Sequence, residues 1–180
     1  MIYAISGKIG SGKTTLAELL KENLISKGRK VEIVNFADKL KEICFLLTGY
    51  YGKTQEEKNI YIEEYGFTVG EALQLIGTNA MRNNYHKDVW VISTFKNMKP
   101  DTDYIIADCR FKNEADFCNK NNAKLIRIDG DPADTRKSSK RDLNHPSETD
   151  LDDYHNWGYY FYNDKSIEEL KNFANFVINN

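Results

Sequence analysis

The chain has 180 residues, of which 41% are hydrophobic and 29% charged, and its net charge is −2 at pH 7. This size fits one globular domain with a proper core and is small for a motor protein or a multidomain ATPase. Mixed charges favour neither nucleic acid nor an anionic membrane as a partner. No apolar run approaches the roughly 20 residues that cross a bilayer, and no signal peptide precedes the first strand, so we expect a soluble cytoplasmic protein. Reduced thiols are expected at Cys44, Cys109 and Cys118, which lack C-x-x-C spacing.

The first motif follows an apolar strand at residues 2–6. Residues 7–14 read GKIGSGKT, which matches the phosphate loop G-x-x-x-x-G-K-[ST] between a strand and an amphipathic helix. Glycines let successive backbone N–H groups converge on an anion, and the helix start adds its dipole. The residues predicted to bind a nucleoside triphosphate are Gly7, Gly10, Ser11, Gly12, Lys13, Thr14 and Thr15.

Three of these residues have separate expected roles. Lys13 supplies a charge for the β and γ phosphates, and the Thr14 hydroxyl suits Mg²⁺. Thr15 is expected to support the loop. Because kinases, GTPases, motors and transport ATPases all use this loop, it does not identify the reaction.

The next elements alternate between strands and helices. The first helix has Leu16, Leu20 and Leu24 on one face and ends at Gly28, and a strand at 31–35 and a helix at 38–48 follow. Polar, tyrosine-rich residues 50–67 indicate a surface excursion. A capping box, Thr68 with Glu71, opens another helix, and a further helix is expected at 88–98. The positions expected to face the core are Leu40, Ile43, Cys44, Leu47, Leu73, Ile76 and Ala80.

The second half continues this alternation. Strands are expected at 104–108, 124–128 and 159–162, with a helix at 113–120 between the first two. Residues 129–156 hold two of the three prolines and indicate a long functional loop. Ser166 opens the last helix, whose expected inward positions are Ile167, Leu170, Ala174 and Val177. The order predicts an α/β fold with a five-stranded parallel sheet and helices on both faces.

Polar residues follow each later strand, where parallel sheets bind their ligands. They are Asp38 after the second strand, Asp108 and Arg110 after the third, Arg136 and Arg141 after the fourth, and Asn163 after the fifth. Asp108 either holds Mg²⁺, directly or through water, or caps the next segment. Arg110 either grips a phosphate or forms a surface salt bridge. Asp38 either caps its helix or contacts substrate.

The loop after the fourth strand is basic. Residues 136–141 read RKSSKR, four cations in six residues. A solvated charge run or a nucleic-acid patch is the ordinary interpretation. In a phosphate-loop protein we favour a lid that brings Arg136 and Arg141 onto the transferring phosphoryl group and excludes water. Asn163 lies in a turn that, in a kinase, often runs beside the adenine.

Several segments together carry a family resemblance. They are GKIGSGKT at 7–14, FADKL at 36–40, LQLIGT at 73–78 with Arg82, DVW at 88–90, DCRFKNE at 108–114 and HPSE at 145–148. In these segments, which span nearly the whole chain, the sequence resembles the deoxynucleoside monophosphate kinases of bacteriophages and large DNA viruses. The resemblance implies a single P-loop kinase domain over residues 1–180, with an acceptor-binding segment at about 36–98 and a lid at about 131–150.

The resemblance also implies the reaction, which is transfer of the γ-phosphoryl group of ATP, with Mg²⁺, to a deoxynucleoside monophosphate. The residues expected at the acceptor are Phe36, Asp38, Arg82, Asp88, Trp90, Arg110, Glu114 and His145, with Glu148 beside His145 at the lid edge. Lys112 stands where a proline is expected. We expect nucleotides as partners, no stable nucleic-acid binding and, for a viral protein, the host cytoplasm. A homodimer through residues 50–65 is left open.

The chemistry of the acceptor separates this reaction from its rivals. A monophosphate is largely dianionic at neutral pH and needs no general base, so catalysis is alignment and charge neutralisation by Lys13, Mg²⁺ and arginines. The closest alternative is a small-molecule or nucleoside kinase that phosphorylates a hydroxyl with Asp38 as base. A GTPase would show an N-K-x-D motif, which this chain lacks, and a nucleic-acid ATPase would need a wider basic face. The sequence does not identify the base or the sugar.

Overall fold

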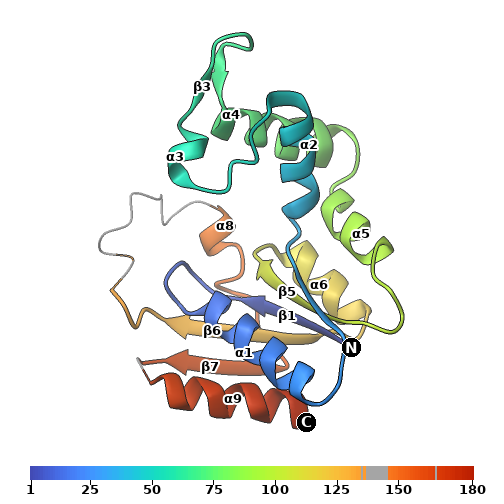
Figure 1. Cartoon of the computed structure of the whole chain (residues 1–180), viewed down its shortest axis with the longest axis vertical. Coiled ribbons are helices and arrows are strands. Elements are labelled where there is room, and N and C mark those ends of the chain that lie inside the picture. Colours follow the sequence, from blue (N-terminus) through green and yellow to red (C-terminus); the bar gives the residue numbers. More distant parts are fainter. Residues whose placement is uncertain (135, 137–145, 165) are drawn as a thin grey trace. The chain divides into compact units, whose positions relative to one another are not determined.

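The computed structural model describes residues 1–134, 136, 146–164 and 166–180, and the chain forms two compact units (Figure 1). The first unit is Met1–Asn35 with Met98–Asn180, and the second is Phe36–Asn97. None of the helices within these described residues is long and apolar enough to cross a membrane.

The first unit contains a five-stranded sheet in the order β2-β5-β1-β6-β7, and every neighbouring pair is parallel. The strands are β1 (Ile2–Ser6), β2 (Val31–Val34), β5 (Asp103–Cys109), β6 (Lys124–Gly130) and β7 (Tyr159–Asn163). The helices are α1 (Lys13–Ser26), α6 (Lys112–Lys120), α8 (Pro146–Thr149) and α9 (Ile167–Asn179). The predicted α/β fold is therefore confirmed, and β1 lies in the centre of the sheet.

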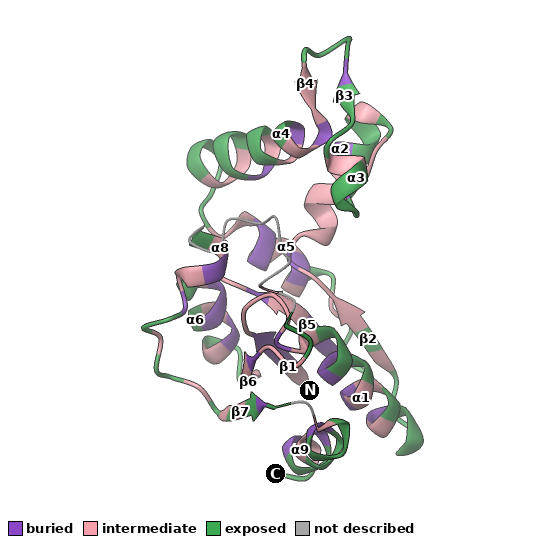
Figure 2. Cartoon of the chain, turned by 90° about the vertical axis from the view of Figure 1, so that its left-hand side faces the viewer, coloured by how far each residue is buried: buried purple, intermediate pink, exposed green. Residues whose placement is uncertain are grey.

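The core of this unit lies between the sheet and the paired helices α1 and α9. Leu16, Leu20 and Leu24 of α1 are fully buried, as their spacing predicts, and Figure 2 shows this buried side of the helix. They pack in one cluster with strand residues and with Leu170, Ala174 and Val177 of α9. The inward position predicted for Ile167 is wrong, because this residue is 52% exposed. Side chains lean toward the N-terminal turn of a helix, and Ile167 begins α9, so no turn precedes it.

The second unit is mainly helical. Its elements are α2 (Asp38–Thr48), α3 (Gln55–Lys58), β3 (Tyr61–Ile62), β4 (Phe67–Thr68), α4 (Val69–Gln74), η1 (Leu75–Asn83) and α5 (Val89–Lys96). The capping box of Thr68 and Glu71 is present at the start of α4. Residues 50–67 are only in part the surface excursion that was predicted, because β3 and β4 form a hairpin and Ile62 belongs to the core cluster with Cys44 and Val69.

Two predicted core positions of this unit are wrong. Leu47 is 55% exposed, because the core cluster around Cys44 ends one turn before it on α2. Ala80 is also exposed. It lies in η1, a nine-residue π-helix whose i→i+5 hydrogen bonds change the spacing of side chains. The period of α4 therefore does not continue to Ala80.

The cysteines behave as expected for reduced thiols. Cys44, Cys109 and Cys118 are free and buried. The neighbouring Cys118 thiol and burial raise the pKa of the Cys109 thiol, so this thiol stays protonated and weakly reactive.

The core of the first unit can be tested on α1, which carries a buried and an exposed aliphatic residue. We expect Leu20→Ala to lower the free energy of unfolding by about 2–5 kcal/mol, since the fully buried Leu20 leaves a cavity. Ile25→Ala is the matched control, because Ile25 is 51% exposed, and should cost less than about 1 kcal/mol. Urea unfolding of the three proteins measures both values, and equal losses would contradict this packing.

Candidate active site

The phosphate loop joins the central strand β1 to helix α1. Gly10 and Gly12 have φ angles of 80° and 97°, which favour glycine. A Cβ atom on Gly12 would lie 2.6 Å from Nδ2 of Asn163, at the end of β7. The same Asn163 amide donates a hydrogen bond of 3.0 Å to the carbonyl of Ser11, so β7 supports the loop from behind.

The loop leaves a group of backbone donors open. Among the described residues, no hydrogen bond uses the N–H groups of Gly10, Gly12, Lys13 or Thr14. Helix α1 starts at Lys13, so its positive dipole end adds to these donors. Several unsatisfied N–H groups at a helix start form a site for an anion such as phosphate.

Lys13 lies beside these donors. Its ammonium donates to the carbonyl of Lys8 at 2.7 Å, which folds the side chain back over the loop. Burial, and then the charge of Arg110, lower the pKa of Lys13 to about 8, while the Glu148 carboxylate opposes this change. Lys13 is therefore mostly charged at neutral pH and holds its proton less tightly than an ordinary lysine.

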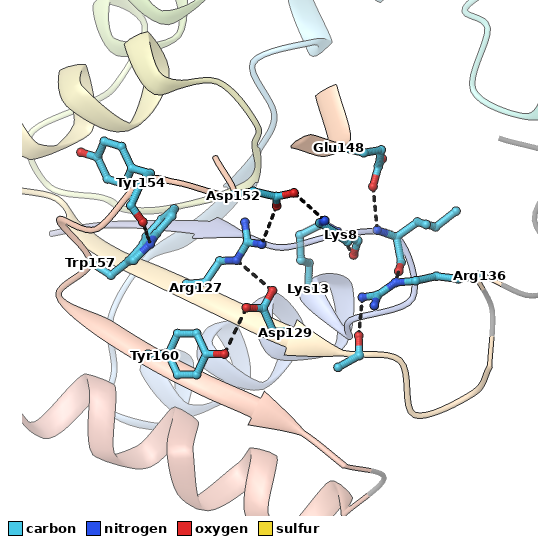
Figure 3. Close-up of polar contacts among 12 residues, drawn as sticks. Lys8, Lys13, Arg127, Asp129, Arg136, Glu148, Asp152, Tyr154, Trp157 and Tyr160 are labelled. Carbon is cyan, nitrogen blue, oxygen red and sulfur yellow. Dashed lines mark hydrogen bonds and ion pairs between the residues drawn. The ribbon is translucent and has the colours of Figure 1, made fainter. Parts of the chain in front are cut away.

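Two residues of the segment after β6 form hydrogen bonds with the phosphate loop, at the backbone N–H and carbonyl of Ile9 (Figure 3). The Ile9 N–H donates to Oε2 of Glu148 at 2.9 Å, and the Ile9 carbonyl accepts from Nε of Arg136 at 3.0 Å. Lys8 forms an ion pair of 2.7 Å with Asp152. Arg136 thus contacts the backbone of the phosphate loop, and its predicted role as a lid residue at the transferring phosphoryl group stays a prediction.

The end of β5 brings Arg110 to this same loop through Glu148. Nη1 of Arg110 lies 2.9 Å from Oε1 of Glu148. The buried Glu114 accepts from the backbone N–H groups of Arg110 and Phe111, at 2.8 and 3.1 Å, so it caps the start of α6. Glu114 therefore fixes the backbone from which Arg110 projects. Asp108, also at the end of β5, is partly buried.

The next strand of the sheet, β6, carries a network of charged residues that was not predicted from the sequence. Arg127 of β6 is only 7% exposed and pairs with Asp129 at 2.9 Å and Asp152 at 3.5 Å. Its guanidinium lies 5.8 Å from the Trp157 ring, and the Tyr160 hydroxyl donates to Asp129 (Figure 3). The sequence signal for this network was an arginine within the apolar strand at 124–128, because a buried arginine requires charged or polar partners.

The remaining predicted site residues are distributed as follows. In the second unit, Arg82 lies on η1 and Asp88 precedes α5. Phe36 is buried, and so is Trp90, whose indole N–H donates to the Gly77 carbonyl at 3.1 Å. Asp38 begins α2.

Two predicted site residues, Arg141 and His145, lie outside the described residues. Thr14 and Thr15 are exposed in the first turn of α1, Ser11 is buried, and Gly7 follows β1.

The charge state of Lys13 can be measured directly. In protein with ¹³C-labelled lysine, the resonance that disappears in Lys13→Met should titrate with a midpoint near 8. Between pH 8 and 10.5 the unfolded chain binds more protons at this site, so this lysine should raise the free energy of unfolding as pH increases across that window. A midpoint near the ordinary lysine value would contradict the burial of this ammonium.

Comparisons with known proteins identify the family of this chain. The family model of deoxynucleotide monophosphate kinases matches residues 30–173. A protein of Acanthamoeba polyphaga mimivirus, described as a candidate deoxynucleotide monophosphate kinase, is 33% identical over 191 residues, covering 94% of this chain and 92% of that protein.

Two solved structures share the fold at 15% identity. Shikimate kinase from Bacteroides thetaiotaomicron has a TM-score of 0.54, covering 99% of this chain and 97% of that chain. The protein APE1195 has a TM-score of 0.52, with 99% and 95% covered. On the family match and the viral relative, the chain belongs to the deoxynucleotide monophosphate kinase family and is a phosphotransferase.

Proposed function

We propose that this enzyme transfers the γ-phosphoryl group of ATP to a deoxynucleoside 5′-monophosphate, with Mg²⁺. The observation that carries the proposal is the set of open N–H donors at the start of α1, beside the partly buried ammonium of Lys13. Such a site suits the phosphates of a nucleotide.

The donor half of the site is the phosphate loop. The backbone N–H groups hold the phosphates of ATP, and Lys13 neutralises the charge that develops during transfer. Because the pKa of Lys13 is about 8, its charge is lost as pH rises through that value. Affinity for ATP should therefore weaken in alkaline solution. Asn163 supports the loop next to the expected position of the adenine.

The residues also fit a magnesium ion. Among the described residues no cluster of three or more metal-binding side chains occurs. Mg²⁺ fits such a site, since it usually takes one or two protein ligands and fills its other positions with phosphate oxygens and water. Thr14, exposed at the helix start, and Asp108, at the end of β5, would hold it. When bound, the ion neutralises charge on the phosphates.

The acceptor roles proposed here follow the family resemblance. Arg110 and Arg82 hold the phosphate of the monophosphate, and Asp88 lies on the same acceptor-side segment. Phe36 and Trp90 are buried, so they act by shaping this segment. We assign Arg136 and Arg141 the lid role of neutralising charge on the transferring group, and His145 belongs to the lid edge by the same resemblance.

This reaction needs no general base, because the acceptor phosphate is already a dianion at neutral pH. Hydroxyl phosphorylation with Asp38 as base is less well supported, since the family match favours a monophosphate acceptor. We further propose a cytoplasmic location. A homodimer through residues 50–65, where Tyr61 and Tyr65 are exposed, stays a prediction.

Two variants separate the two halves of the site. We expect Lys13→Ala and Arg82→Ala each to lower kcat/KM by at least about 100-fold, since each removes a charge that neutralises a phosphate. Arg82→Ala should keep the wild-type Kd for ATP, measured by equilibrium binding. Lys87→Ala, an exposed cation on the same unit, is the matched control. Unchanged turnover in Arg82→Ala would remove Arg82 from the acceptor site.

The acceptor class can be tested by ADP release against a panel of ribo- and deoxynucleoside monophosphates and nucleosides. Monophosphates should stimulate release and nucleosides should not. Asp38→Asn should change turnover by less than about 10-fold, because no base is required, whereas loss of a catalytic base typically costs about 10²–10⁴-fold. Stimulation by nucleosides alone, abolished in Asp38→Asn, would favour the hydroxyl kinase.

A further inference from the structure

Glu148 is a buried carboxylate in strongly basic surroundings. Its side chain is 4% exposed, and the charges of Arg110 and Lys13 act on it. Burial alone would raise the pKa of this carboxyl, but the Ile9 N–H and the Arg110 guanidinium hold it below its usual value. Glu148 is therefore ionised throughout the neutral range.

The two carboxylate oxygens serve two different parts of the site. Oε1 accepts from Nη1 of Arg110 at 2.9 Å, and Oε2 accepts from the N–H of Ile9 at 2.9 Å. One of these groups follows β5 and the other belongs to the loop after β1. Glu148 thus joins the phosphate loop to an arginine from the neighbouring strand.

Arg110 is held in a way that leaves most of its donors open. Nη1 contacts Glu148 and, at 3.5 Å, the carbonyl of Ser147. Within the described residues, Nε and Nη2 of Arg110 make no hydrogen bond or ion pair, and the side chain is 28% exposed. The Arg110 backbone N–H is fixed by Glu114. The arginine is therefore anchored at both ends while part of its guanidinium remains free for an anion.

We propose that Glu148 is a positioning residue, which orients the Arg110 guanidinium for the acceptor phosphate and fixes its place relative to the phosphate loop. The proposal rests on the proposed function in one respect, namely that Arg110 holds the acceptor. Buried ion pairs add little net stability, because desolvation offsets their attraction. Glu148 then contributes by fixing the relative positions of the two reacting phosphates. Small displacements between reacting groups lower the reaction rate strongly.

The substitution Glu148→Gln tests this role, since it keeps the size of the side chain and removes its charge. A glutamine side chain has one acceptor oxygen, whereas Ile9 and Arg110 both donate. Its amide nitrogen would face one of these donors, and the bridge would break. The substitution Glu148→Asp keeps the charge on a shorter side chain and should retain part of the function.

The experiment is a double-mutant cycle of Glu148→Gln, Arg110→Ala and the double variant. Initial rates are measured at pH 7, where Lys13 is charged, with saturating ATP and the deoxynucleoside monophosphate that the wild type phosphorylates fastest. We expect kcat/KM for the monophosphate to fall about 10-fold in Glu148→Gln and about 100-fold in Arg110→Ala. The double variant should lie within about 3-fold of Arg110→Ala, because Glu148 acts through Arg110. Because Glu148 also contacts the phosphate loop through Ile9, the saturating ATP concentration is set for each variant from its own Kd for ATP.

Asp101→Asn is the matched control. Asp101 also forms an ion pair, with Lys30 at 2.7 Å, but its side chain is 62% exposed, and it precedes β5 at the end of the sheet away from the phosphate loop. Its kcat/KM should stay within about 3-fold of wild type. Urea unfolding monitors the folding of every variant, and Glu148→Asp replaces Glu148→Gln in the cycle if the latter does not fold.

The outcomes separate this inference from the function on which it rests. Losses that multiply in the double variant would show that Glu148 acts independently of Arg110 and would overturn the positioning role. Wild-type kcat/KM in Glu148→Gln, together with an impaired Arg110→Ala, would overturn it as well. Full activity in Arg110→Ala would instead refute the acceptor role of Arg110 in the proposed function.

Discussion

The site depends on backbone N–H groups that have no protein partner among the described residues, in a loop held by hydrogen bonds from neighbouring segments. Unpaired donors are unfavourable in a folded protein unless water or a ligand satisfies them. The loop before α1 leaves its donors at the partly exposed end of the central strand, and it is immobilised from outside. Both backbone polar groups of Ile9 are held by Glu148 and Arg136, and the Ser11 carbonyl is held by Asn163. Side chains that follow the neighbouring strands thus hold the loop in a conformation whose N–H groups are available to an anion.

A second constraint is mutual repulsion among the cations that an anion site needs. Arg110, Arg127 and Arg136 all lower the pKa of Lys13, after burial has already done so. The Glu148 carboxylate opposes this effect and raises the pKa of Lys13. The arginines therefore supply positive potential for two phosphates, while the negative charge of Glu148 helps to keep Lys13 protonated before substrate binds.

Local patterns predicted much of this molecule. Residues 7–14 identified the nucleotide site because strand, loop and helix occur in the required order, and Leu16, Leu20 and Leu24 identified the buried face of α1. Periodicity failed where the helix geometry changed, as at Ala80, and where the helix began, as at Ile167. The bridge from Glu148 to Ile9 and Arg110 joins residues that lie far apart in the sequence, so no local pattern carries it.

The π-helix η1 has a consequence for how this family can diverge. Its nine residues include the buried Gly77, where a Cβ atom would lie 2.7 Å from Leu40 and whose carbonyl accepts from the Trp90 indole. A π-helix has i→i+5 hydrogen bonds where an α-helix has i→i+4 bonds, so removing one residue from this stretch would change the register of the side chains that follow it. The direction of Arg82 would then rotate about the helix axis. Insertion or deletion of one residue in this segment can therefore change which side chains it presents, in addition to what substitution can do.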